Sequence, residues 1–139
     1  MRFISLFTGL IFLAGCAKAW YVGEWVVTDV RFPTVSALGA DEAREWFGSR
    51  AVYSDSHVSF RGERCESPKF ELGSYTESDF IMAYRTSFVQ LGIEGDSVSI
   101  LRVTCTGVSV FPGSTLVKVT NDMIYAPWEG AFFRLDRQS

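Results

Sequence analysis

The N-terminal segment limits which part of the chain can fold. Arg2 gives it a positive charge, and residues 3–13 (FISLFTGLIFL) form an apolar run that is followed by small residues and Cys16. A charged start, about 7–15 apolar residues and small residues before a cleavage point are typical of a secretory signal. The run is shorter than the roughly 20 apolar residues that a membrane-spanning helix needs. We therefore expect residues 1–15 to be removed and residues 20–139 to form one β-rich periplasmic domain.

The four residues Leu13-Ala14-Gly15-Cys16 resemble the lipobox of bacterial lipoproteins. The resemblance implies that Cys16 becomes the first residue of the mature protein and carries fatty acyl chains, such as palmitate, on its sulfur and its amine. Several such chains, at ~0.8 kcal/mol per buried CH₂, hold a protein firmly to a membrane. Residues 16–19 would then be the anchor and a short tether. The alternative is an ordinary secretory signal cleaved after Ala17 or Ala19, which would discard Cys16.

The residues that follow Cys16 favour one of the two membranes. In lipoproteins, an aspartate directly after the lipidated cysteine usually implies retention on the inner membrane, whereas this chain has Ala17 and Lys18. The resemblance therefore implies a place in the bacterial cell envelope, at the periplasmic face of the outer membrane.

Two further cysteines, Cys65 and Cys105, remain after Cys16. An even pair in an oxidising compartment indicates a disulfide. The loop that it closes is long, so the chain-entropy model gives about 4 kcal/mol of stabilisation. The alternatives are two free buried thiols or a metal site. A zinc site is disfavoured because neither cysteine has a second one nearby and His57 is the only histidine.

The charge and composition exclude some partners. The formal net charge is −3, and removal of Arg2 with the signal makes the remaining chain more acidic. Nucleic-acid binding requires a basic patch, and none is present, so we expect no nucleic-acid partner. The sequence also contains no phosphate loop, metal-ligand set or cofactor fingerprint, so we predict no metal or cofactor.

The composition and the residue pattern predict a mainly β domain. Twelve Phe, five Tyr and four Trp, together with many Val and Thr, favour strands over helices. Alternating or apolar segments bounded by turn residues predict strands at 20–32, 69–75, 97–105, 115–120, 123–126 and 130–137, with two short strands in 51–61. Helical spacing predicts short helices at 36–47 and 78–85. We therefore expect a small antiparallel barrel or sandwich of about eight strands with one or two short helices. The barrel is favoured because closure removes exposed sheet edges.

Gly23-Glu24-Trp25 resembles the Gly-x-Trp signature of lipocalins. The resemblance implies that Trp25 lies at the base of a barrel, with an arginine from the last strand, Arg134 or Arg137, packed over its indole. A guanidinium can stack on an indole face and still donate hydrogen bonds. The alternative is that Trp25 simply anchors the core of another small β fold.

The sequence offers weak candidates for catalysis. His57 lies beside Ser54, Asp55, Ser56 and Ser59, but a nucleophile and its base must meet in a specific geometry that adjacency does not supply. No Gly-x-Ser-x-Gly elbow is present. We therefore predict an exposed turn and no catalytic residue.

Acidic residues gather around Cys65, and paired carboxylates can hydrolyse glycosides. They are Glu63, Glu66, Glu71, Glu77 and Asp79. Nothing in their spacing fixes such a pair, so we predict a solvated face.

Five aromatic residues are candidates for an exposed binding surface, with core packing as the alternative. They are Tyr21, Trp46, Tyr84, Tyr125 and Trp128. An eight-stranded barrel is either filled by side chains or holds one small ligand. With so many aromatic side chains in a short chain, we expect a filled interior.

These observations predict a non-enzymatic binding or scaffolding module, held to the membrane through Cys16 and facing an envelope protein partner. One alternative is a periplasmic inhibitor of lysozyme or of another cell-wall hydrolase, by analogy with other small envelope β-domains that contain one disulfide. A second alternative, implied by the resemblance to lipocalins, is a carrier of a small apolar ligand.

Overall fold

The computed structural model describes residues 18–107 and 110–139. Leu13-Ala14-Gly15-Cys16, the expected cleavage point and the lipid attachment lie outside these residues, so they stay predictions.

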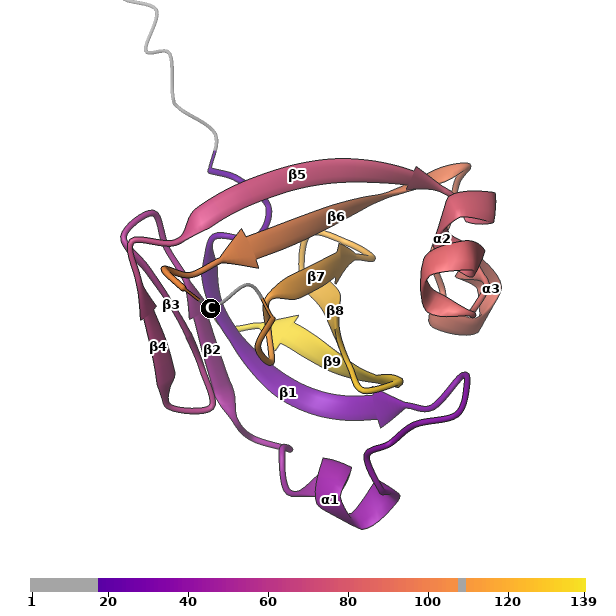
Figure 1. Ribbon diagram of the computed structural model, residues 1–139, viewed down its shortest axis with the longest axis horizontal. Coiled ribbons are helices and arrows are strands. Elements are labelled where there is room, and N and C mark those ends of the chain that lie inside the picture. The colour runs from indigo at the N-terminus through magenta and orange to yellow at the C-terminus, as the bar shows by residue number, and fades with distance from the viewer. Residues whose placement is uncertain (1–17, 108–109) are drawn as a thin grey trace, which may run out of the picture.

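The domain is a single antiparallel sheet that curls into a half-barrel (Figure 1). Its nine strands are β1 (Gly23–Arg31), β2 (Arg50–Tyr53), β3 (His57–Phe60), β4 (Glu63–Glu66), β5 (Lys69–Thr76), β6 (Ser97–Thr104), β7 (Thr115–Lys118), β8 (Met123–Trp128) and β9 (Ala131–Arg137). The short helices are α1 (Ala40–Arg44), α2 (Glu77–Tyr84) and α3 (Phe88–Leu91). The predicted fold class, mainly β with antiparallel strands, is confirmed.

The described residues contain one strand and one helix more than predicted. The extra strand is β4, a stretch in which the sequence predicted no strand. Arg61 and Gly62 both have positive φ, 52° and 84°, and form the whole connection between β3 and β4. Such a two-residue turn matches the twist of the strands that it joins, so β4 starts directly after it. The extra helix, α3, is capped at its N-terminus by Ser87, which forms a capping box with Gln90.

The two strands at the centre of the sheet come from the two ends of the domain. The strand order is β4-β3-β2-β1-β9-β8-β7-β6-β5, so β1 and β9 are neighbours. Their register places Trp25 opposite Arg137 and shifts between Val27 and Asp29. On either side of this pair, the sheet is a meander of consecutive strands.

Strands β6 to β9 are apolar on both faces. Consecutive side chains point to opposite faces of a strand. One face contributes Leu101, Leu116, Ile124 and Phe133 to the core inside the half-barrel. The other face contributes Ile100, Val117, Tyr125 and Phe132 to a second core, which α2 and α3 cover with Phe80, Phe88 and Leu91. This second layer explains why these strands lack a polar face.

The inner core is filled with aromatic side chains. Trp46, which follows α1, is buried and stacks on Phe133 of β9 with ring centroids 4.1 Å apart and planes 7° apart. Its edge meets Phe60 of β3 at 5.9 Å. The indole of Trp46, in the loop that contains α1, therefore packs between the two halves of the sheet and contacts both.

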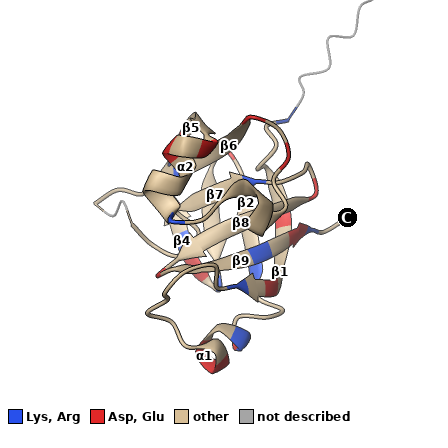
Figure 2. Ribbon diagram, turned by 90° about the vertical axis from the view of Figure 1, so that its right-hand side faces the viewer, with Lys and Arg blue, Asp and Glu red and all other residues tan. Residues whose placement is uncertain are grey.

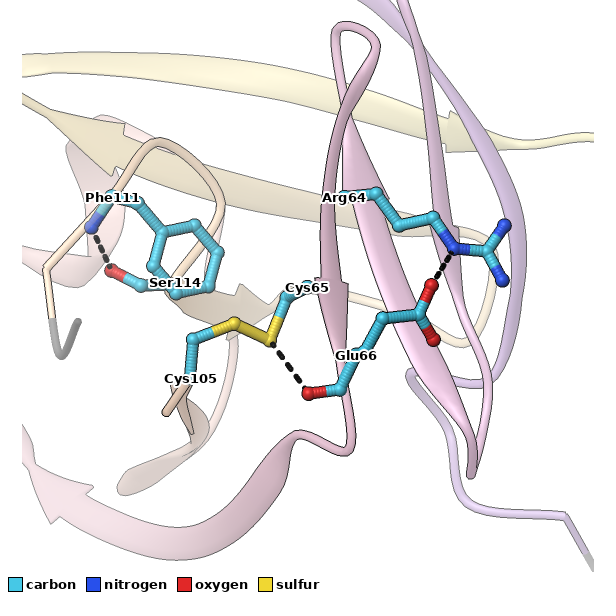
Figure 3. The surroundings of a disulfide bond; sticks show 6 residues. All are labelled: Arg64, Cys65, Glu66, Cys105, Phe111 and Ser114. Atoms are coloured by element: carbon cyan, nitrogen blue, oxygen red, sulfur yellow. Dashed lines mark hydrogen bonds and ion pairs between the residues drawn. A yellow bond between two sulfur atoms is a disulfide. The ribbon is translucent and has the colours of Figure 1, made fainter. Parts of the chain in front are cut away.

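The sheet curls but does not close by hydrogen bonds, because β4 and β5 are its two edges. Cys65 of β4 and Cys105, which follows β6, are joined in a disulfide with their Cα atoms 5.8 Å apart (Figure 3). The link connects one edge strand to the strand beside the other edge. The disulfide therefore joins covalently the two sides of the sheet that backbone hydrogen bonds leave apart.

Acidic and basic residues are interspersed over the described surface (Figure 2). For example, helix α1 contains Asp41, Glu42 and Arg44, and Asp41 and Arg44 form an ion pair of 2.7 Å. In the part of the chain that the structure covers, no helix has both the length and the apolar character to cross a membrane.

Candidate functional site

One end of the half-barrel is closed by Trp25 and Arg137. The guanidinium carbon of Arg137 lies 4.2 Å from the centroid of the Trp25 ring. Arg137 also donates hydrogen bonds to the carbonyl oxygens of Val22 (2.8 Å) and Asn121 (3.0 Å). A Cβ on Gly23 would lie 2.5 Å from the Arg137 guanidinium, which explains the glycine of the Gly-x-Trp pattern. We call this arrangement the base.

Of the two candidate arginines, Arg137 takes the place over Trp25 and Arg134 does not. Arg134 forms an ion pair with Asp136 at 3.1 Å. Because side chains alternate along β9, Arg137 shares a face with the core residues Phe133 and Leu135, whereas Arg134 and Asp136 lie on the other face. The predicted pairing of Trp25 with Arg134 is therefore wrong, because Arg134 lies on the opposite face of β9 from Arg137.

Ser54, Asp55 and Ser56 form the turn between β2 and β3, whereas His57 and Ser59 belong to β3. The Ser54 hydroxyl lies 3.0 Å from Nδ1 of His57, accepts from its backbone N–H (3.2 Å) and lies 3.1 Å from its carbonyl oxygen. These contacts order the turn. Among the described residues no carboxylate is hydrogen-bonded to His57. Asp55 acts instead on Tyr21, whose pKa is raised by burial and by that carboxylate.

The carboxylates near Cys65 do not converge. Glu63 and Glu66 lie on opposite faces of β4, and Glu71 lies on β5. Glu77 begins α2 and accepts a hydrogen bond from the backbone N–H of Phe88. Within residues 18–107 and 110–139, no three His, Cys, Asp or Glu side chains lie close enough together to hold a metal ion.

A groove of about 610 Å³ lies at the end of the half-barrel opposite the base. It is formed where β1 has ended, where β8 turns into β9, and where α2 ends. We call it the end groove. The residues that matter for its chemistry are Val35, Tyr84, Arg85, Val110, Trp128 and Phe132.

One wall of the end groove is fixed by the turn between β8 and β9. Glu129 and Gly130 have positive φ, 51° and 87°. The Glu129 carbonyl accepts hydrogen bonds from the Ser36 hydroxyl and from the backbone N–H of Ala37, both at 2.9 Å. A Cβ on Gly130 would lie 2.4 Å from the Val35 carbonyl oxygen, so only glycine lets the two segments approach this closely. The side chain of Val35 is nevertheless 93% exposed.

The opposite wall is the end of α2. Tyr84 packs against Phe80 (4.8 Å between centroids) and against Phe132 (6.1 Å), and burial raises its pKa. The next residue, Arg85, ends the helix in the left-handed conformation (φ 59°) with its N–H bonded to the Ile81 carbonyl. Glycine is usual at this position. Among the described side chains, Arg85 has no ion-pair or hydrogen-bond partner.

The end groove combines an apolar floor with one charge on each wall. Tyr84 and Trp128 supply aromatic surface over the buried Phe132, and Arg85 and Glu129 supply opposite charges. A site of this kind holds a ligand by apolar contact and orients it with few polar groups.

The sequence predicted part of this site. Tyr84 and Trp128 line the end groove, as the search for a surface of aromatic residues suggested. Tyr21, Trp46 and Tyr125 are buried in the core. Val35, Val110 and Arg85 were not predicted. For the two valines the reason is that the sequence does not distinguish an exposed valine from a buried one.

No family model, curated protein or solved structure matches this chain. The function is therefore argued from the chain's own geometry.

Proposed function

We propose that this protein is a lipid-anchored, non-enzymatic binding module of the bacterial envelope that holds a small apolar ligand in the end groove. The observation that carries the proposal is the groove itself, which offers about 610 Å³ of space above an aromatic floor. Pockets for small molecules typically measure about 300–1,000 Å³ and are mainly apolar.

Two exposed valines on the rim of the end groove support the proposal that the groove binds a ligand. Val35 is 93% exposed and Val110 is 72% exposed, and both border the groove. Apolar side chains gathered around a concavity often mark a binding site, whereas a single exposed one needs no explanation. A ligand seated between them would remove both from water.

The position of the groove relative to the base also supports this function. Arg137 and Trp25 close one end of the half-barrel, and Trp46 fills the interior between β3 and β9. The end groove is left as the place where an apolar molecule can meet aromatic surface without displacing the core. This favours the carrier over the inhibitor of a cell-wall hydrolase and over a scaffold, both of which need a partner protein.

The membrane anchor is the second half of the proposal and rests on Leu13-Ala14-Gly15-Cys16. The described chain begins at Lys18, only a few residues before β1 (Gly23–Arg31). Acyl chains on Cys16 would hold the domain close to the periplasmic face of the outer membrane, where apolar molecules concentrate.

Binding can be tested with the neutral fluorescent probe N-phenyl-1-naphthylamine. The Cys16→Ser protein is used, because acyl chains and detergent would bind the probe themselves. We expect saturable fluorescence enhancement. Val35→Ser and Val110→Ser should each weaken binding about fivefold, since each removes roughly 1 kcal/mol of apolar contact.

Val89→Ser is the matched control. Val89 is 82% exposed on α3 and does not border the groove, so its variant should bind the probe like the unchanged protein. Equal loss in Val89→Ser and Val35→Ser, or no saturable binding, would exclude the end groove as the ligand site.

A further inference from the structure

A second cavity lies at the seam where the half-barrel fails to close. It measures about 390 Å³ and lies between β4 and the described residues Cys105, Thr106, Phe111 and Pro112, beside the disulfide. We call it the seam pocket. Phe60 of β3 and all four residues of β4, Glu63, Arg64, Cys65 and Glu66, also line it.

Aromatic side chains form part of the walls of the seam pocket. Phe60 is 3% exposed and joins the inner core, and Phe111 packs against the same core from the loop after β6. Phe111 lies next to the disulfide (Figure 3). Its backbone N–H donates to the Ser114 hydroxyl at 3.2 Å, which fixes the loop on this side of the pocket.

The tight turn at Arg61 and Gly62 decides which charge faces the pocket. It places Glu63 directly opposite Phe60 and Cys65 opposite Val58. Residues opposite each other in an antiparallel pair share a face. Glu63 therefore lies on the inner face of β4, with Phe60 and Cys65.

The other two charged residues of β4, Arg64 and Glu66, border the pocket from the outer face of the strand and neutralise each other. Figure 3 shows Arg64 and Glu66 extending away from the disulfide and meeting in an ion pair. Glu63 has no ion pair or side-chain hydrogen bond with any residue that the structure describes. The seam pocket thus combines aromatic walls with one unneutralised carboxylate.

We infer that the seam pocket binds a small organic cation with an apolar body, such as an arylalkylammonium ion. Aromatic faces attract cations, and the attraction grows when water is excluded. The Glu63 carboxylate completes the charge match, while Phe60, Phe111 and the disulfide contact the apolar body. This site is separate from the end groove and does not depend on the function proposed for it.

The probe for a test is 2-phenylethylammonium, titrated into the ¹⁵N-labelled, disulfide-bonded Cys16→Ser protein. Backbone amide shifts are followed by NMR. We expect saturable shifts at residues 63–66 and 105–106. The neutral 2-phenylethanol and the anionic 3-phenylpropionate, which have similar apolar bodies, should bind at least about fivefold more weakly, the effect of one exposed charge pair.

Glu63→Gln and Glu71→Gln form a matched pair, because both glutamates are exposed strand residues and Glu71 of β5 does not line the seam pocket. Glu63→Gln should weaken binding of 2-phenylethylammonium about fivefold, whereas Glu71→Gln should leave it within about twofold. Because both residues are exposed, we expect each variant to fold, which thermal unfolding checks.

Three results would overturn the inference: equal affinity for the cation and the alcohol, equal loss in the two glutamine variants, or shifts confined to residues outside the pocket.

Discussion

The phenol of Tyr53 donates a hydrogen bond to the carbonyl oxygen of Gly113 at 2.6 Å, with the tyrosine fully buried. This bond links β2 to the loop between β6 and β7, across the seam that the sheet leaves open. A Cβ on Gly113 would lie 2.7 Å from that phenol oxygen and 2.6 Å from the Phe60 ring. Burial also raises the pKa of the Tyr53 phenol, so it remains a donor throughout the physiological range.

Tyr53→Phe should destabilise the domain by about 1–3 kcal/mol, because it leaves the buried Gly113 carbonyl without its donor. Chemical denaturation followed by circular dichroism measures the effect. Tyr75→Phe is the control, since the Tyr75 hydroxyl meets Arg102 at an exposed site. Equal stability of Tyr53→Phe and the unchanged protein would contradict a structural role for the bond.

Reduction of the disulfide should lower the free energy of unfolding by about 4 kcal/mol. The two cysteines are 40 residues apart, and a cross-link over such a loop removes that much chain entropy from the unfolded state. Mass spectrometry should show a gain of two hydrogens on reduction. Cys65→Ser/Cys105→Ser should reproduce the loss of stability, and an unchanged mass would show that the thiols are free.

Arg137→Lys should destabilise the domain by about 1–3 kcal/mol, because lysine cannot both stack on Trp25 and donate to several carbonyls. Arg134→Lys should cost less, since Arg134 is partly exposed and contacts one carboxylate. Thermal unfolding of the two variants side by side tests this. A larger loss in Arg134→Lys would contradict the assignment of the base.

Asp136 should make stability depend on pH below neutrality. Burial pushes its pKa upward, but hydrogen bonds from Arg134 and Thr28 and the charge of Arg134 outweigh this, so its pKa lies below the ordinary value of 3.8. The stabilisation is therefore present above the unfolded pKa and is lost as the pH falls through the lower folded pKa.

Asp136→Asn should thus lower stability at pH 7 by about 1 kcal/mol, typical of a partly exposed pair. The difference from the unchanged protein should shrink below about pH 4. Asp41→Asn, in the exposed pair with Arg44, is the control and should show little effect at any pH. A difference that grows in acid would have the wrong sign.

Cys16→Ser should abolish membrane attachment if the lipobox is used. In a detergent phase-separation assay, the unchanged protein should enter the detergent phase and the variant should stay in the aqueous phase. Retention of Cys16→Ser in the detergent phase would remove the basis for the anchor and for the localisation that follows from it.

Most strands could be predicted because their own residues alternate. Residues 97–105 and 130–137 carry the apolar pattern of strands, and the structure has β6 and β9 there. By contrast, β4 contains three charged residues and one cysteine, so its own pattern does not indicate a strand. The strand forms because the turn at Arg61 and Gly62 brings it into antiparallel pairing with β3.

The choice between Arg134 and Arg137 shows a similar limit. Phe132 and Phe133 are both buried, one on each face of β9, so the alternation does not reveal which arginine faces inward. The register with β1 decides it, by placing Arg137 opposite Trp25. The end groove was harder still to predict, because Val35, Arg85 and Val110 come together only through the topology of the sheet.

The adjacency of β1 and β9 has a consequence for how the chain acquires its structure. Each half of the sheet consists of hairpins between consecutive segments, which form rapidly because little loop entropy is lost. The contact that unites them joins the first strand to the last, so almost the entire polypeptide must be present before the halves can unite. Until then each half has an unpaired border at what becomes the middle of the sheet, and premature loss of the C-terminal segment would leave that border permanently available for misassociation.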